Sequence, residues 1–207
     1  MKKISHPFND CEKLPPQTSL LIVGTAPPPR FSSQATPKAL RGLDFEFYYG
    51  SEDNDMWIIL EEIAGRREGI KLFQDDYSSK ECIDAARYFL KRHNISMQDV
   101  LNTYQRKSGR DESASDSDIV PPEPEDFLRF KPIFERCSLL RAIAFTSQQA
   151  AHWTFAAMRQ QGLIQVIGLS NILAEWRARG EGIARYAAPL LELSVSSRIV
   201  RFFFLPS

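Results

Sequence analysis

The sequence is poor in cysteine, in net charge and in long apolar runs, and each shortage excludes a class of protein. Its three cysteines, Cys11, Cys82 and Cys137, are widely spaced among 207 residues. This spacing is typical of reduced thiols and cannot supply a four-cysteine iron–sulfur cluster. No histidine or cysteine pair has metal-binding spacing, so we expect neither a metal nor another cofactor. The 26 basic and 26 acidic side chains cancel, so any nucleic-acid binding must use a local basic patch.

Signals for membranes and for secretion are also absent from the pattern. No apolar run is long enough to span a bilayer, and the first residues lack the apolar core of a secretory signal. We therefore expect no membrane partner and a location in the cytoplasm, or in the nucleus if the source is eukaryotic. Hydrophobic content of 43% and charged content of 25% are ordinary for a globular chain. The length suits one domain, 1–207, which we expect to be a monomer.

Apolar runs of strand length alternate with amphipathic segments along the chain. We predict strands at 19–23, 142–146 and 198–205, with a further edge or connecting strand at 191–196. Helices are predicted from residue 54 or 55 to about 65 and at 80–94, 147–161 and 171–179, the last capped by Ser170. Residues 1–18 are expected to form an arm or a short helix, and 106–126 an exposed excursion. Because no hairpin signal joins the strands, the pattern predicts a three-layer α/β/α sandwich with a mostly parallel central sheet.

The strongest functional pattern lies in residues 19–60. The first strand runs into Gly24-Thr25-Ala26-Pro27-Pro28-Pro29, where glycine allows close approach and the prolines prevent further strand pairing. Further along stand Phe47-Tyr48-Tyr49-Gly50, Asn54 and Trp57, just before an amphipathic helix. Ligands of parallel sheets bind outside the carboxyl ends of the strands, so we expect a flat group to bind between these two segments.

The two motifs together, Gly-x-x-Pro after a strand and Phe-Tyr-Tyr-Gly-x-x-x-Asn-x-x-Trp before a helix, resemble the uracil-DNA glycosylase superfamily. Their wording is closest to the deoxyinosine (hypoxanthine)-DNA glycosylase branch and, more distantly, to the mismatch-specific branch. The resemblance implies a monofunctional base-excision repair enzyme. It would hydrolyse the N-glycosidic bond of a deaminated base, hypoxanthine or uracil, after flipping it out of DNA.

The resemblance also implies roles for individual residues. Asn54 would be catalytic and orient a water molecule, because the residue that handles water in several branches is Ala26 here. Tyr49 would stack on the flipped base, and the base would contact the backbone of Gly24, Thr25, Ala26 and Pro27. Pro206 and Ser207 match the start of a loop that contacts the DNA backbone, and the rest of that loop and its helix are missing from the sequence. Catalysis would rest on orientation and on stabilisation of the leaving base.

Other interpretations stay open. Asn54 equally suits capping of the helix that follows it. Relatives carry His-Pro and Arg where this chain has Ser51-Glu52 and Asp55, and the carboxylates of Glu52, Asp53 and Asp55 should repel phosphates. These carboxylates and the missing loop favour a noncatalytic superfamily member that binds nucleic acid, a free base or a nucleotide. A small-molecule hydrolase on the same sheet would have no DNA affinity. Five arginines near the C-terminus suit a basic patch or a solvated face: Arg177, Arg179, Arg185, Arg198 and Arg201.

Overall fold

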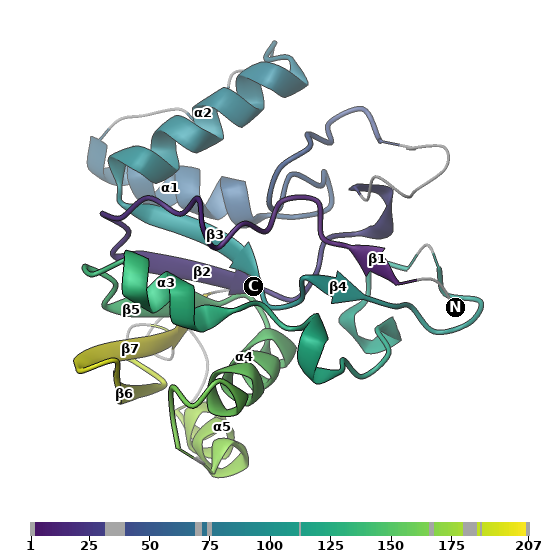
Figure 1. Ribbon diagram of the computed structural model, residues 1–207. Helices are drawn as coiled ribbons and strands as arrows, with labels where there is room; N and C mark the ends of the chain where they lie inside the picture. Colours follow the sequence, from purple (N-terminus) through teal and green to yellow (C-terminus); the bar gives the residue numbers. More distant parts are fainter. Residues whose placement is uncertain are drawn as a thin grey trace.

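A five-stranded sheet with the order β3-β2-β5-β7-β6 forms the centre of the molecule (Figure 1). The computed structural model describes residues 3–31, 40–68, 72–73, 76–111, 113–165, 168–179, 186 and 188–205, without the side chains of 64–68. Pro206 and Ser207, which were predicted to contact the DNA backbone, lie outside the described residues, as does Arg185.

Four strands of the sheet are parallel: β2 (Leu20–Gly24), β3 (Ile95–Asp99), β5 (Ala142–Phe145) and β7 (Arg198–Phe204). The edge strand β6 (Leu191–Val195) pairs antiparallel with β7. The inner parallel strands are covered on both faces, which explains why their sequences are continuous apolar runs and do not alternate. The predicted mostly parallel sheet is confirmed.

The last two strands form a hairpin, for which the sequence analysis found no signal. The turn consists of Ser196 and Ser197, between the paired residues Val195 and Arg198. Both serines have left-handed backbone angles, φ 48° and φ 63°. Two left-handed residues match the twist of the flanking strands, but Asn-Gly is the usual sequence signal for such a turn. The Ser196-Ser197 pair is therefore not a sequence signal for a hairpin.

Helices cover both faces of the sheet, so the three-layer arrangement is confirmed (Figure 1). Helices α1 (Met56–Glu68) and α2 (Ser79–Arg92) lie on one face. Helices α3 (Phe130–Arg136), α4 (Gln148–Gln160) and α5 (Leu169–Ala178) lie on the other. No helix in the described ranges is long and apolar enough to cross a membrane.

The strands divide their side chains between two cores. Leu21 and Val23 of β2 belong to the core beneath α3, α4 and α5, whereas Ile22 belongs to the core beneath α1 and α2. Successive side chains of a strand point to opposite faces, so one strand supports both cores. Removing any of these buried side chains would leave a cavity in a core.

The helix ends agree with the predictions in two places and differ in one. Ser147 caps α4 by accepting a hydrogen bond from the Ala150 N–H, and Gly162 follows the helix with φ 69°. Ser170, the predicted cap of α5, lies inside that helix, which begins at Leu169 with Gly168 in the cap position. Glycine serves as a cap without any side-chain contact, so the more obvious serine misled the prediction.

The N-terminal arm and the segment 106–126 both pack more closely than predicted. The arm carries strand β1 (Ile4–Ser5), which pairs with β4 (Thr103–Tyr104) beyond the carboxyl ends of β2 and β3 (Figure 1). The segment includes the short 3₁₀ helices η2 (Asp116–Asp118) and η3 (Pro124–Asp126). Arg106, Ile119 and Asp126 are buried, and Arg106 and Ile119 bridge each other, although most of the other described residues of this segment are exposed as predicted.

The capping box of α2 provides a test of local stability. Ser78 accepts a hydrogen bond from the Glu81 N–H, and Glu81 accepts one from the Ser78 N–H at 2.8 Å. We expect Ser78→Ala to lower the free energy of unfolding by about 1 kcal/mol. Urea denaturation measures this change, and Ser108→Ala, at an exposed turn residue, is the control. Equal stability of the two variants would contradict the capping role.

Candidate functional site

A cavity of about 380 Å³ opens where the carboxyl ends of three parallel strands meet. Strand β2 lies between β3 and β5. The chain reaches β3 through helices on one face and β5 through a helix on the other, so the connections diverge at β2. Such a switch point leaves a crevice in an open α/β sheet. The cavity is lined by residues following β2, by Asp99 at the end of β3, and by Thr146 and Ser147 after β5.

The cavity brings most of the predicted site residues together. Tyr49 and Asn54 line it, as do Thr25, Ala26 and Pro27 from the other motif. The two motifs therefore meet as the sequence pattern predicted. The individual roles assigned to these residues stay predictions.

Gly24 is not among the residues that line the cavity, unlike the other predicted residues of its motif. It lies behind the Tyr49 side chain. A Cβ atom at Gly24 would stand 2.1 Å from the Tyr49 hydroxyl and 2.3 Å from Asp99 Oδ1. No side chain fits there, so glycine is required for the Tyr49 ring to reach the end of β3. The space that a side chain would occupy is filled by the hydroxyl and the carboxylate.

Tyr49 is held in an unusual conformation. Its backbone has φ 55°, in the left-handed region that few residues other than glycine adopt. Burial raises the pKa of the Tyr49 hydroxyl well above its usual value, so the group stays protonated and can donate. It donates to Asp99 Oδ1 over 3.3 Å. Backbone strain of this kind persists where surrounding contacts determine the conformation, and it is frequent in functional sites.

Asp99 is a buried carboxylate with two side-chain donors. His6 Nδ1 accepts hydrogen bonds from the backbone N–H groups of Phe8 and Asn9, at 3.0 and 2.9 Å. Because Nδ1 accepts, the proton of the imidazole must be on Nε2. His6 Nε2 therefore donates to Asp99 Oδ2, at 2.8 Å. The carboxylate accepts from both His6 and Tyr49 and keeps further lone pairs for a ligand or a water molecule.

The Asn9 amide fixes the backbone of the same aspartate. Asn9 Oδ1 accepts from the Asp99 N–H at 2.9 Å, and Asn9 Nδ2 donates to the Asp99 carbonyl at 2.7 Å. Asp99 and His6 are site residues that were not predicted from the sequence. Asp99 follows the mixed stretch Ile95-Ser96-Met97-Gln98 and gave no clear signal, and His6 is 93 positions away from it.

Asp116 supplies a second carboxylate to the cavity. The Thr25 and Ser147 hydroxyls donate to Asp116 Oδ2, at 2.7 and 3.2 Å. Burial raises the pKa of Asp116, and the charge of Asp99 adds to this effect, while the two hydroxyl donors oppose it. The segment 106–126, predicted as an exposed excursion, thus returns to the sheet and delivers Asp116 to the site.

Asn54 has the contact that the capping interpretation requires. Its Oδ1 accepts a hydrogen bond from the Met56 N–H at 2.9 Å, at the start of α1. The Asn54 amide keeps further hydrogen-bonding capacity after capping, because its oxygen has a second lone pair and Nδ2 has two donor hydrogens. Asn54 is exposed and lines the cavity. The same residue can therefore cap the helix and donate to a ligand, and its catalytic role stays a prediction.

Two arginines partly neutralise the acidic segment after Gly50. Arg41 forms ion pairs with Asp53 and, at 3.6 Å, with Glu52. Arg30 donates to Asp44 at 2.7 Å and to the Ser51 hydroxyl at 2.6 Å, and approaches Asp53 within 3.6 Å. These pairs reduce the repulsion of phosphates that the sequence analysis expected.

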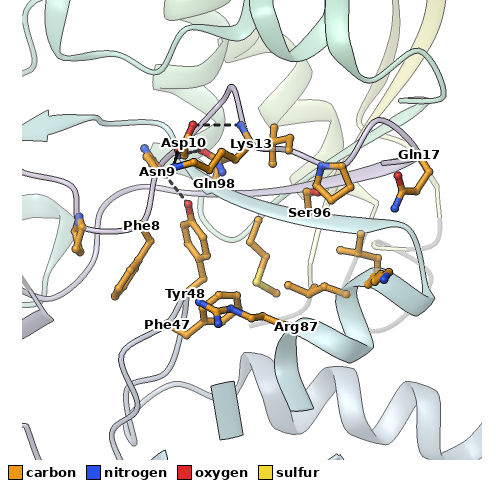
Figure 2. Close-up of a pocket in the computed structure, with 17 residues that line it drawn as sticks. Phe8, Asn9, Asp10, Lys13, Gln17, Phe47, Tyr48, Arg87, Ser96 and Gln98 are labelled. Carbon is orange, nitrogen blue, oxygen red and sulfur yellow. Dashed lines mark hydrogen bonds and ion pairs between the residues drawn. The ribbon is translucent and has the colours of Figure 1, made fainter. Parts of the chain in front are cut away.

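A second cavity of about 570 Å³, the edge groove, lies along the free edge of β3 (Figure 2). The N-terminal arm, β3 and α2 form its walls. Phe47 and Tyr48 line both cavities, so these two residues separate them. The lining residues of the edge groove include Phe8, Asn9, Asp10, Lys13, Gln17, Phe47, Tyr48, Arg87, Lys91, Ser96, Met97 and Gln98.

Four of the five C-terminal arginines make hydrogen bonds within the protein, and Arg185 lies outside the described residues, so the basic patch that we considered stays a prediction. Arg198 donates to the carbonyls of Cys137 and Phe134, and Arg201 donates to Glu192. Arg179 donates to the Pro189 carbonyl, and Arg177 to Gln148. Within the described ranges, no cluster of three acidic, histidine or cysteine residues is arranged to hold a metal ion.

Comparisons with known proteins give one structural likeness. No protein-family model matches the chain, and no curated protein matches it. The chain is similar to a solution NMR structure of a candidate uracil DNA glycosylase from Methanosarcina acetivorans, with 24% sequence identity and a TM-score of 0.47. The match covers 77% of this chain and 79% of that one. We take no activity and no residue role from a likeness of this degree.

The crowding at Gly24 predicts a stability effect. Gly24→Ala must displace Tyr49 or Asp99, so we expect it to lower the free energy of unfolding by about 1 to 3 kcal/mol. Gly42→Ala is the matched control, because no atom lies within 4 Å of its added Cβ. Both are measured by urea denaturation. If the two variants are equally stable, the close contact of Tyr49 and Asp99 over Gly24 is wrong.

The pKa of Asp116 predicts a pH-dependent effect of Asp116→Asn. A raised pKa means that protonated Asp116 favours the folded state at low pH and that this contribution is lost as pH rises through the folded-state pKa. Asparagine stays neutral and still accepts one hydrogen bond. We therefore expect the variant to gain stability relative to the wild type between pH 4 and pH 8, measured by urea denaturation at both values. A difference that does not change with pH would contradict the raised pKa.

Proposed function

We propose that this protein is a DNA glycosylase of the uracil-DNA glycosylase superfamily, which removes hypoxanthine or uracil from DNA and leaves an abasic site. The observation that carries the proposal is the meeting of the two sequence motifs in one cavity that also contains the carboxylate of Asp99. The motifs alone resemble the superfamily, and the cavity supplies a place where their residues can act together.

The cavity suits a flat, polar ligand such as a flipped base. Its size lies in the usual range for small-molecule sites. Thr25, Ala26 and Pro27 line it next to the Tyr49 ring, so a base could contact backbone on one side and an aromatic face on the other. Stacking of a base on an aromatic ring contributes on the order of 1–3 kcal/mol.

The proposed reaction is hydrolysis at C1′ of the deoxyribose. The water oxygen forms a bond to C1′ while the C1′–N bond breaks, and the bonding pair leaves with the base. In this proposal Asp99 accepts the proton of the water, and the Asn54 amide donates a hydrogen bond to the departing base. The base takes up a proton, so the products are an abasic site and a neutral base.

Asp99 suits proton acceptance better than Asn54, because an amide is a very weak base. Ala26, at the position that handles water in several branches, has no polar side-chain atom. The Asp99 side chain accepts hydrogen bonds from His6 Nε2 and from the Tyr49 hydroxyl, and Asn9 fixes its orientation through the backbone. A preoriented carboxylate needs little rearrangement in the transition state. These contacts support a division of labour in which Asp99 acts on water and Asn54 on the base.

The proposal predicts cleavage of oligonucleotides that carry one deoxyinosine or one deoxyuridine. End-labelled single and double strands are incubated with the protein and treated with hot alkali, which cuts at abasic sites. We expect single-turnover rates of Asp99→Asn to fall by about 100-fold or more, the usual contribution of general base catalysis. Asn54→Asp keeps an oxygen for the Met56 N–H but has no amide donors, so it separates capping from catalysis. We expect Asn54→Asp and Asn54→Ala both to lose activity.

The outcomes separate the possible functions. If stoichiometric wild-type protein cuts no substrate while a known glycosylase does, the enzymatic proposal is wrong. Salt-sensitive DNA binding without cleavage would then identify a noncatalytic DNA-binding protein. Full activity of Asp99→Asn in an active enzyme would reject only the role of Asp99, and activity of Asn54→Asp would leave Asn54 as a helix cap.

A further inference from the structure

The edge groove is a second cavity that the roles proposed above leave unused. It follows the free edge of β3 between Gln98 and Ile95, and Phe47 and Tyr48 separate it from the cavity of about 380 Å³ at the strand ends, the base cavity. Figure 2 shows Phe47 and Tyr48 between α2 and the N-terminal arm. The Tyr48 hydroxyl donates to Asn9 Oδ1 at 3.2 Å, which ties this wall to the arm. A strand that leaves the base cavity over this wall would enter the groove directly.

The charges that line the groove are mostly positive. Arg87 and Lys91 are four residues apart on α2, so they lie on the same face of the helix, roughly 6 Å apart at Cβ. Both are exposed. The third cation, Lys13, comes from the arm and pairs with Asp10, the one carboxylate of the lining residues, at 2.8 Å. Pairing of Lys13 with Asp10 leaves Arg87 and Lys91 as the excess positive charge.

Arg87 and Lys91 are weakly committed to the protein. The Arg87 guanidinium lies over the Phe47 ring at 5.7 Å from its centroid, and its ion pair with Asp84 is long, at 4.0 Å, and exposed. Exposed pairs of this kind contribute little. Among the described residues, no carboxylate lies within ion-pair distance of Lys91. The C-terminal arginines, by contrast, are engaged with carbonyls and with Glu192. The edge groove thus has the local positive charge that a chain of zero net charge needs for DNA binding.

The floor of the groove offers flat apolar surface and hydrogen-bonding groups. Phe8 and Phe47 present aromatic rings, whereas Ser96 and Gln98 of β3 are buried and already bond Thr18 and the Asp10 N–H. The outer edge of β3 adds backbone groups. Asn9 binds both backbone groups of Asp99 on that edge, and strand alternation places those of Met97 on the same edge. A positively charged groove with aromatic rings is the usual arrangement for binding unpaired nucleic acid.

We propose that the edge groove binds a single-stranded segment of DNA next to the nucleotide held in the base cavity, with its phosphates at Arg87 and Lys91. This inference rests on the proposed function, and it adds that the enzyme prefers single-stranded DNA to duplex DNA. Bases in a duplex are stacked and paired, so they cannot lie against Phe8 or Phe47, whereas those of a single strand can. The protein should therefore prefer single-stranded substrates, or substrates with an unpaired flank.

The test is neutralisation of the two cations. Binding of a fluorescent single-stranded oligonucleotide with one deoxyinosine is measured by anisotropy at several salt concentrations. Loss of two phosphate contacts should lower the slope of log Kd against log salt by about 1.4 in Arg87→Gln/Lys91→Gln, because each contact on a single strand contributes about 0.7. Kd should rise by about tenfold in low salt, equivalent to 1.4 kcal/mol. The matched control, Lys131→Gln/Arg159→Gln, removes two exposed cations from α3 and α4 and should keep the wild-type slope.

Excision by the same proteins separates failure of this inference from failure of the proposed function. If the wild type excises the base and the groove variant keeps its Kd, salt slope and KM, the groove proposal is wrong and the glycosylase proposal stands. Equal loss of binding in the control pair would also overturn the groove proposal, because any surface charge would then serve. Weakened binding of the groove variant alone, without excision by any protein, would support the groove and reject the glycosylase. Urea denaturation of each variant verifies that it is folded.

Discussion

The site depends on one close contact, where the Tyr49 hydroxyl and the Asp99 carboxylate meet over the backbone of Gly24. Three segments far apart in sequence converge there: the end of β2, the end of β3 and the aromatic motif before α1. The contact constrains each of these segments. Position 24 must lack a side chain, Tyr49 must hold a left-handed backbone, and a carboxylate must be buried. The contact brings the aromatic motif to the carboxyl ends of the strands, where a parallel sheet can bind a ligand.

The N-terminal arm connects the edge of the sheet with the site. A free strand edge exposes backbone groups that can pair with other chains. The Asn9 amide covers the last of these groups on β3, and His6 in the same arm donates to the Asp99 side chain. Tyr48 donates to Asn9 from the other side. The arm therefore protects an edge, orients a carboxylate and forms one wall of the edge groove.

The distribution of charge matters more here than its sum. Basic and acidic side chains are equal in number, but the basic ones differ in how strongly they are bound within the protein. Arg30 and Arg41 hold the acidic segment after Gly50, and the C-terminal arginines bind carbonyls and Glu192. Arg87 and Lys91 have only weak ties to the protein and line a groove beside the base cavity. A protein of zero net charge can have a local positive surface in this way.

The sequence by itself determined the layered fold and the meeting of the two motifs. Continuous apolar runs require strands covered on both faces, and parallel strands place their carboxyl ends along one edge, so the strand ending at Gly24 and the motif around Tyr49 could be placed together. Only the tertiary structure decided which polar groups complete the site. His6, Asp99 and Asp116 come from an arm, a strand end and a segment that seemed exposed. Hydrogen bonds between residues so far apart in the chain leave no periodic pattern, because they depend on distances that exist only after folding. The same limit explains the hairpin at Ser196 and Ser197 and the second hydrogen-bonding capacity of Asn54, which depend on backbone angles and on geometry in space.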